Sequence, residues 1–262
     1  MANSLLTVVS LSGIPALTTA LGATAAAFRP PGATIRSAIQ HFAAGVVFSV
    51  VAVELLPDVT RVHDLFEIGW TFAAGVALML TIERFSRRLE GSDPGPPIPE
   101  STSVPVAPHA RPSSSATSIK SGQLVAIGID ILIDGLLIGI ALAAGRKEGL
   151  LLTAALSLEL LSLGLAIAAP LALSGVSKLR TILVPTALSL LIVVGAVIGD
   201  TVLRGASEHT LAGVLSFGSA ALLYLVTEEL LVDAHETPDT TGATAMFFAG
   251  FLLFLLLGMA GA

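Results

Sequence analysis

Three acidic residues interrupt an otherwise apolar part of this sequence. Asp130 and Asp134 lie in the apolar stretch 122–144, and Glu159 lies in the next one, 149–173. An ionised side chain at the centre of a lipid bilayer costs roughly 2.5–3.5 kcal/mol or more, so such residues usually have a function. Neither stretch contains a Lys, Arg or His that would neutralise them. The three carboxyl groups therefore predict a site that binds a cation or protons.

The spacing of these residues predicts that they meet. Asp130 and Asp134 are four residues apart and therefore share one face of a helix. Glu159 lies on the following helix, which is expected to return antiparallel after a short loop around residues 145–147. Three ionised carboxylates at one depth repel each other, and a bound cation or protonation relieves the repulsion. The structural alternative is a set of protonated carboxyls that hydrogen-bond between the two helices.

The rest of the chain has the composition of a membrane protein. Of its 262 residues 54% are hydrophobic and 12% are charged, and the mean hydropathy is +0.89, whereas soluble domains carry about 25% charged residues. A spanning helix needs roughly 20 mostly apolar residues. Because no basic segment precedes the first stretch, it is interpreted as a spanning helix and not as a signal peptide. We predict an all-α membrane protein with eight transmembrane helices, at 4–27, 35–57, 66–83, 122–144, 149–173, 181–203, 209–233 and 242–261.

The polar residues predict how these helices are organised. Segment 84–121 is rich in Pro and Ser, and we expect a disordered cytoplasmic linker there. It separates helices 1–3 (1–83) from a central pair (122–173) and from helices 6–8 (181–262). If both termini lie outside, nine Lys and Arg residues lie inside, namely Arg29, Arg36, Arg84, Arg87, Arg88, Arg111, Lys120, Lys178 and Arg180. Only four then lie outside, which favours outer termini in a cell (inner or plasma) membrane.

One offset of 175 residues superposes two short patterns. The sequence ELLPD at 54–58 ends helix 2, and ELLVD at 229–233 ends helix 7. FAAG at 72–75 and FAG at 248–250 follow at the same separation. Helices 2 and 7 are five spans apart, so the two copies cross the membrane in opposite directions. Such an inverted repeat is typical of transporters, and the alternative is chance similarity between apolar helices.

Further polar residues flank the predicted site on both sides. They form an acidic entrance at the end of helix 2 and an acidic exit at the end of helix 7, as expected for a cation that moves inwards. The alternative is that they are solvated helix ends. The lone His41 in helix 2 is interpreted as a packed or pore-lining residue and not as a ligand. The possible pathway residues are Glu54, Asp58, Glu228, Glu229, Asp233 and His235.

Over essentially its whole length the chain resembles the ZIP (Zrt-, Irt-like) family of metal transporters. Family members have eight spans, outer termini and a long cytoplasmic loop between helices 3 and 4. Their 3+2+3 arrangement relates helices 1–3 to helices 6–8 by inversion. FAAGV at 42–46 with ELLPD at 54–58 looks like the family's helix 2, and EELLVDAH at 228–235 is similar to bacterial forms that end EELIPEAH. The resemblance implies this fold and divalent-metal transport.

The metal motifs depart from those of the family. Its helix 4 typically reads His-Asn-x-x-Asp/Glu-Gly, and an anchor on Asp134 places Asp130 at the His position. Its helix 5 typically reads His/Gln-Glu/Asp-x-Pro-His/Glu-Glu/Gly, and Glu159 takes the first ligand position. The resemblance therefore implies one metal site, made of Asp130, Asp134 and Glu159, with a second site deleted. The remaining ligand positions are apolar: Ile131, Leu160, Leu163 and Ile192.

The ligand types bear on the ion and the partners. All-carboxylate sites favour hard ions such as Mn²⁺ and Mg²⁺, although Zn²⁺ or Fe²⁺ with water ligands stays open. We expect a transported zinc, manganese or iron ion, contact with the lipid bilayer and no permanently bound cofactor. Small residues in helix 3 permit a homodimer, which family members often form. Basic patches with interleaved aromatics are absent, which argues against nucleic acid.

The sequence also bears on three other functions. The lost ligands favour a non-transporting ZIP-like protein, and a cation/proton exchanger on the same fold is intermediate. An intramembrane hydrolase is disfavoured, because Asp130 and Asp134 share one helix and the sequence has no HExxH motif. The chain also lacks cysteine, which excludes thiol nucleophiles and thiolate metal sites. We therefore expect no enzymatic activity.

Overall fold

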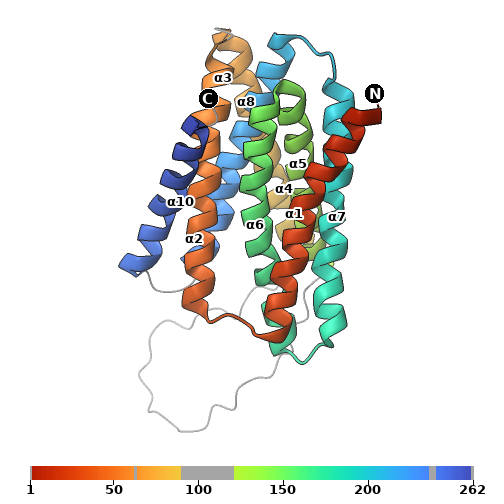
Figure 1. The fold of residues 1–262 in the computed structure, drawn as a ribbon, viewed down its shortest axis with the longest axis vertical. Coiled ribbons are helices and arrows are strands. Elements are labelled where there is room, and N and C mark those ends of the chain that lie inside the picture. Colours follow the sequence, from red (N-terminus) through yellow and green to blue (C-terminus); the bar gives the residue numbers. More distant parts are fainter. Residues whose placement is uncertain (1, 62–63, 90–120, 236–239, 261–262) are drawn as a thin grey trace.

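The computed structural model describes residues 2–61, 64–89, 121–235 and 240–260, and it places them in helices joined by short connections. Within these residues there is no β-strand, and eight helices are long and apolar enough to cross a membrane. The prediction of an all-α membrane protein with eight spans is therefore confirmed. The eight helices run roughly parallel to one another, along the long axis of the molecule (Figure 1).

Two of the eight spans contain a π-helical segment near one end. The second span joins α2 to α3 through the π-helix η1, and the seventh joins α8 to α9 through the π-helix η2. The elements in chain order are α1 (Ala2–Phe28), α2 (Ala33–Val50), η1 (Val51–Leu55), α3 (Leu56–Thr60), α4 (Leu65–Leu89), α5 (Ser121–Ala144), α6 (Arg146–Leu173), α7 (Lys178–Leu203), α8 (Glu208–Tyr224), η2 (Leu225–Leu230), α9 (Leu231–Ala234) and α10 (Thr241–Ala260).

The observed helices differ from the predicted spans by a few residues at their ends, and two of these differences bear on the linker and the site. Helix α4 continues to Leu89, so residues 84–89 are helical and not part of a linker, while 90–120 lie outside the described residues. Helix α6 begins at Arg146 and not at 149, because Gly145 alone, with an extended backbone, connects it to α5. The predicted loop at 145–147 thus shrinks to one residue, and Lys147 lies in the first turn of a helix.

Successive spans reverse direction, and this defines two faces of the bundle. The start of α1, the end of α10 and the connection between α5 and α6 lie together at one end, here called the terminal face (Figure 1). The start of α5 and the end of α9 lie at the other end, here called the opposite face. Helix α5 therefore runs from the opposite face to the terminal face, and α6 runs back.

Four spans form the centre of the bundle and four surround it. In the spans built on α2, α5, α6 and α8, between 56% and 67% of the residues are buried. In those built on α1, α4, α7 and α10 the share is between 11% and 33%, because these helices turn apolar side chains towards the lipid. The carboxylate-bearing helices α5 and α6 therefore belong to the central group.

Close contacts of backbone on backbone hold the outer helices against the central ones. A methyl group on Gly75 of α4 would overlap the carbonyl oxygen of Phe217 of α8. A methyl group on Gly250 of α10 would overlap the carbonyl oxygen of Phe42 of α2 in the same way. Small residues that let helix backbones approach closely are the usual means of packing helices in a membrane.

The glycine contact of α4 predicts a stability effect. The change Gly75→Ala should destabilise the bundle by roughly 1–3 kcal/mol, because α4 must move away from α8 to admit the methyl group. The matched control is Gly69→Ala on the same helix, where a Cβ meets no atom within 4 Å. Thermal denaturation in detergent should show a lower midpoint for Gly75→Ala only. Equal midpoints for the two variants would contradict this packing.

Candidate cation site

The three predicted carboxylates meet in the centre of the bundle. One carboxylate oxygen from each of Asp130, Asp134 and Glu159 lies within 4.8 Å of the other two. Asp134 is 1% exposed and Glu159 is 3% exposed, whereas Asp130 is partly exposed. Two neighbouring antiparallel helices, α5 and α6, thus supply a compact group of oxygens at one depth, as their spacing in the sequence predicts. We call these three residues the carboxylate cluster.

Two oxygens of the cluster lack hydrogen-bond partners among the described residues. They are Oδ2 of Asp134 and Oε2 of Glu159, and both are buried. A buried polar atom without a partner costs roughly 1–3 kcal/mol. Each of these oxygens is therefore available to accept a hydrogen bond from a protonated neighbour or to bind a cation.

Glycines next to the cluster bring two outer helices against it. A methyl group on Gly135, next to Asp134, would overlap the carbonyl oxygen of Ile192 on α7. A methyl group on Gly164 of α6 would overlap the carbonyl oxygen of Thr19 on α1. The central pair is therefore held from both sides by tightly packed backbone, which fixes the positions of the cluster carboxylates.

The donor set suits a hard cation. Oxygen ligands bind Mg²⁺ at about 2.0–2.1 Å and Ca²⁺ at about 2.3–2.6 Å. An ion shared by oxygens as far apart as 4.8 Å lies at least half that distance from one of them, so the carboxylates would move closer together around an ion as small as Mg²⁺. Three ionised carboxylates carry one more negative charge than a divalent ion neutralises. A proton or a further cation can neutralise the remaining charge.

Glu229 on η2 lies close to the cluster on the side of the opposite face. Its carboxyl group interacts electrostatically with those of Asp130, Asp134 and Glu159. It also interacts with Asp233, one turn further along, and both side chains are exposed. Glu228 is exposed as well. Of the residues predicted to form an exit, Glu229 and Asp233 therefore form an acidic series that leads away from the cluster.

The end of this series contains two histidines. The ring of His41 on α2 lies 5.1 Å from the ring of His235, centre to centre, and His41 is only 3% exposed. Nδ1 of His41 contacts the carbonyl oxygen of Ser37 at 2.9 Å. The Nε2 amide of Gln40 donates to Asp233 over 3.4 Å. His41 is thus a packed residue at the end of the predicted pathway.

The pathway residues on the terminal side are paired with cations. Glu54 on η1 forms an ion pair of 3.3 Å with Lys147 on α6, and its side chain is 10% exposed. Asp58 forms an ion pair of 2.9 Å with Arg61 on the same helical turn. The sequence analysis missed Lys147, because the residue was assigned to a loop. A signal was present in the sequence, because Lys147 precedes the predicted helix that carries Glu159 and is predicted on the same side of the membrane as the acidic end of helix 2.

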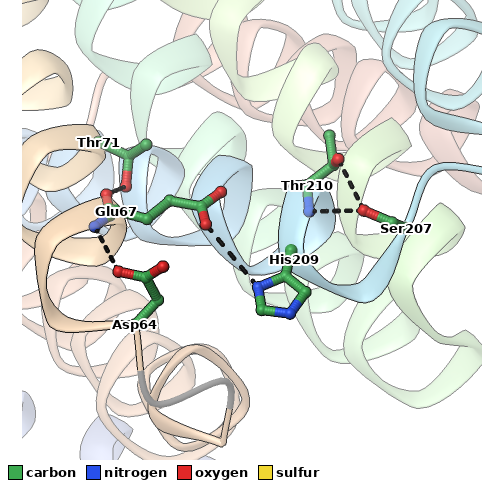
Figure 2. Close-up of polar contacts among 6 residues, drawn as sticks. All are labelled: Asp64, Glu67, Thr71, Ser207, His209 and Thr210. Carbon is green, nitrogen blue, oxygen red and sulfur yellow. Dashed lines mark hydrogen bonds and ion pairs between the residues drawn. The ribbon is translucent and has the colours of Figure 1, made fainter.

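Other polar groups at the terminal face support helix ends. Oδ1 of Asp64 accepts a hydrogen bond from the backbone N–H of Glu67, and so caps α4. The Glu67 carboxylate lies 3.8 Å from Nδ1 of His209 at the start of α8, and Ser207 caps that helix by accepting from the N–H of Thr210 (Figure 2). These contacts join the beginnings of α4 and α8.

The chain was also compared with known proteins. No family model matches it, and no curated protein matches it.

The unpartnered oxygens predict an unusual response to mutation. Asp134→Asn removes one charge from the cluster, so in metal-free detergent it should stabilise the protein by roughly 1–3 kcal/mol. The control is Asp200→Asn on α7, which removes the ion pair of a 7% exposed carboxylate with Arg204 and should destabilise. Thermal denaturation measures both effects. Equal losses of stability in the two variants would mean that Asp134 is a satisfied structural group.

Proposed function

We propose that this protein is a membrane transporter for divalent metal ions, and that the ion binds at Asp130, Asp134 and Glu159. The observation that carries the proposal is the buried carboxylate cluster between two central helices, with oxygens that lack partners among the described residues. Buried ionisable groups at membrane depth are a mark of ion pathways. Manganese and iron suit the oxygen ligands better than zinc, because the site has no imidazole.

The contacts of the outer helices support an inverted repeat. Phe42 and Phe217 are 175 residues apart, and so are Gly75 and Gly250. In the first copy Gly75 packs on Phe217, and in the second Gly250 packs on Phe42. The π-helices also correspond, since η1 (Val51–Leu55) shifted by 175 residues falls within η2 (Leu225–Leu230). Equivalent residues therefore make equivalent contacts between the two copies.

The central pair fits the same symmetry. Gly22 of α1 packs on the carbonyl oxygen of Leu161, and Gly195 of α7 packs on that of Leu132. Glu159 lies two residues before Leu161, and Asp130 lies two residues before Leu132. Inversion therefore exchanges α1 with α7 and α6 with α5, and it makes Glu159 equivalent to Asp130. The two carboxylates face each other across the symmetry element, where a single ion can bind both.

These contacts agree with the 3+2+3 arrangement that the resemblance to the ZIP family implies. We therefore propose a ZIP-like bundle in which the central spans move relative to the outer ones and expose the cluster to each side in turn. With outer termini, as the positive charges favour, the terminal face is outside and the ion moves towards the cytoplasm across the cell membrane. No step of this cycle requires a catalytic residue.

The test is metal analysis of purified protein. The unchanged chain and an Asp130→Ala/Asp134→Ala/Glu159→Ala variant are each loaded with Mn²⁺, Fe²⁺, Zn²⁺ and Mg²⁺ in turn. We expect about one ion per chain, with the highest occupancy for Mn²⁺ or Fe²⁺, and loss of binding in the variant. The same amount of metal in both proteins would contradict the assigned site.

Transport itself is tested in proteoliposomes. Asp134→Ala and Glu159→Ala should each abolish uptake of the bound ion while the protein still reaches the membrane. The control is Glu67→Gln, a carboxylate near the terminal face that is remote from the cluster. Uptake that persists in both cluster variants would exclude a pathway through these carboxylates.

A second candidate is a non-transporting membrane protein with the same fold. It is favoured by Ile131, Leu160 and Ile192, which are all 0% exposed and fill the positions where the resemblance implies a second metal. This candidate predicts that no ion is retained after purification and that the triple variant behaves like the unchanged chain.

A further inference from the structure

Two equivalent glutamates, Glu54 and Glu229, have different surroundings in this structure. They are related by the 175-residue offset, and each lies in a π-helix. Glu229 is exposed and interacts with the three carboxylates of the cluster. Glu54 is largely buried and is paired with Lys147. The structure is therefore asymmetric about the cluster, although the contacts between its helices are symmetric.

Apolar side chains seal the cluster on the terminal side. Residues one and two turns beyond Asp134 on α5, and the corresponding residues before Glu159 on α6, continue the same helix faces towards the terminal face. They are at most 1% exposed: Ile138, Ala141, Leu152, Ala155 and Leu156. On the other side of the cluster, the partly exposed Asp130 is followed by the exposed Glu229. Apolar side chains thus continue from the cluster towards the terminal face, whereas acidic side chains continue from it towards the opposite face.

The ion pair between Glu54 and Lys147 joins two of the central spans at the terminal end of the bundle. Glu54 belongs to the second span, and Lys147 is in the first turn of α6, the helix that carries Glu159. Lys147 also interacts electrostatically with Asp58. On its other side Glu54 lies against Gly258 of α10, where a methyl group would overlap its carboxylate. The pair is thus enclosed by three helices.

We propose that Lys147 is a positioning residue whose ion pair with Glu54 latches the terminal side of the pathway shut. The inference rests on the proposed transport function, because it assigns the two sides of the bundle to the two ends of one pathway. Breaking the pair loosens the contact between η1 and the first turn of α6 within the central group, so that water and ions reach the apolar seal. The equivalent Glu229 has acidic neighbours in place of a lysine.

Lys147 has space into which it can withdraw. A cavity of about 390 Å³ adjoins it and is lined by Arg146, Lys147, Leu150, Leu151 and Leu257. The alkyl chain of a lysine packs well on leucine side chains while the ammonium group stays at the membrane surface. The lysine can therefore leave Glu54 without being buried as an isolated charge.

The absence of cysteine in the natural sequence allows a direct test. Ala155→Cys introduces one thiol into the seal, at a 0% exposed position one turn from Glu159. The protein is reconstituted in vesicles, and a membrane-impermeant thiol reagent is added to the terminal face. Orientation is determined from protease access to a tag at the C-terminus. We expect slow labelling with Lys147 present and several-fold faster labelling with Lys147→Gln.

Three further variants distinguish the specific effect of this ion pair from a general loosening of the helix packing. Lys147→Arg keeps the charge and should restore slow labelling, whereas Glu54→Gln breaks the same pair from its other member and should accelerate labelling. Arg61→Gln removes the exposed member of another ion pair at the same face and should leave the rate unchanged. An unchanged rate in both Lys147→Gln and Glu54→Gln overturns the latch, as does equal acceleration in Arg61→Gln. Because labelling requires no ion flux, a failed latch is distinguishable from failed metal transport.

Discussion

The repulsion among three carboxylates inside an apolar bundle constrains the whole structure. In a medium of low polarity like charges interact strongly, and each charged group loses its favourable contact with water. A chain that keeps Asp130, Asp134 and Glu159 within 4.8 Å of one another must stabilise this arrangement through the rest of the fold. Glycine contacts bring backbones together on both sides of α5 and α6, so that packing of the outer helices holds the two carboxylate-bearing helices in place.

The cluster has different surroundings on its two sides. Towards the opposite face, the acidic residues continue through Glu229 to Asp233. Towards the terminal face, apolar residues separate the cluster from the paired Glu54 and Lys147. The two ends of the bundle therefore differ in how charge is distributed around the cluster.

Much of the fold was predictable, because spans are marked by length and hydropathy and because charges in apolar helices are conspicuous. The i, i+4 spacing of Asp130 and Asp134, together with the short return to Glu159, was sufficient to predict the cluster. The partner of Glu54 was not predicted, because it depends on the one-residue connection at Gly145 that brings Lys147 into α6. The glycine contacts between helices depend on rotation of each helix about its axis, which hydropathy alone does not determine.

The π-helices have a consequence for how Glu54 and Glu229 can move. A π-turn holds one more residue than an α-turn, so the extra residue can pass along the helix when hydrogen bonds exchange partners. When the extra residue moves past a neighbouring residue, the side chain of that neighbour rotates about the helix axis by about 100° and shifts along the axis by about 1.5 Å. Both glutamates lie within such segments. A local change in the hydrogen-bond register of the helix can therefore change the direction in which each carboxylate points, while the remaining turns of its span stay packed.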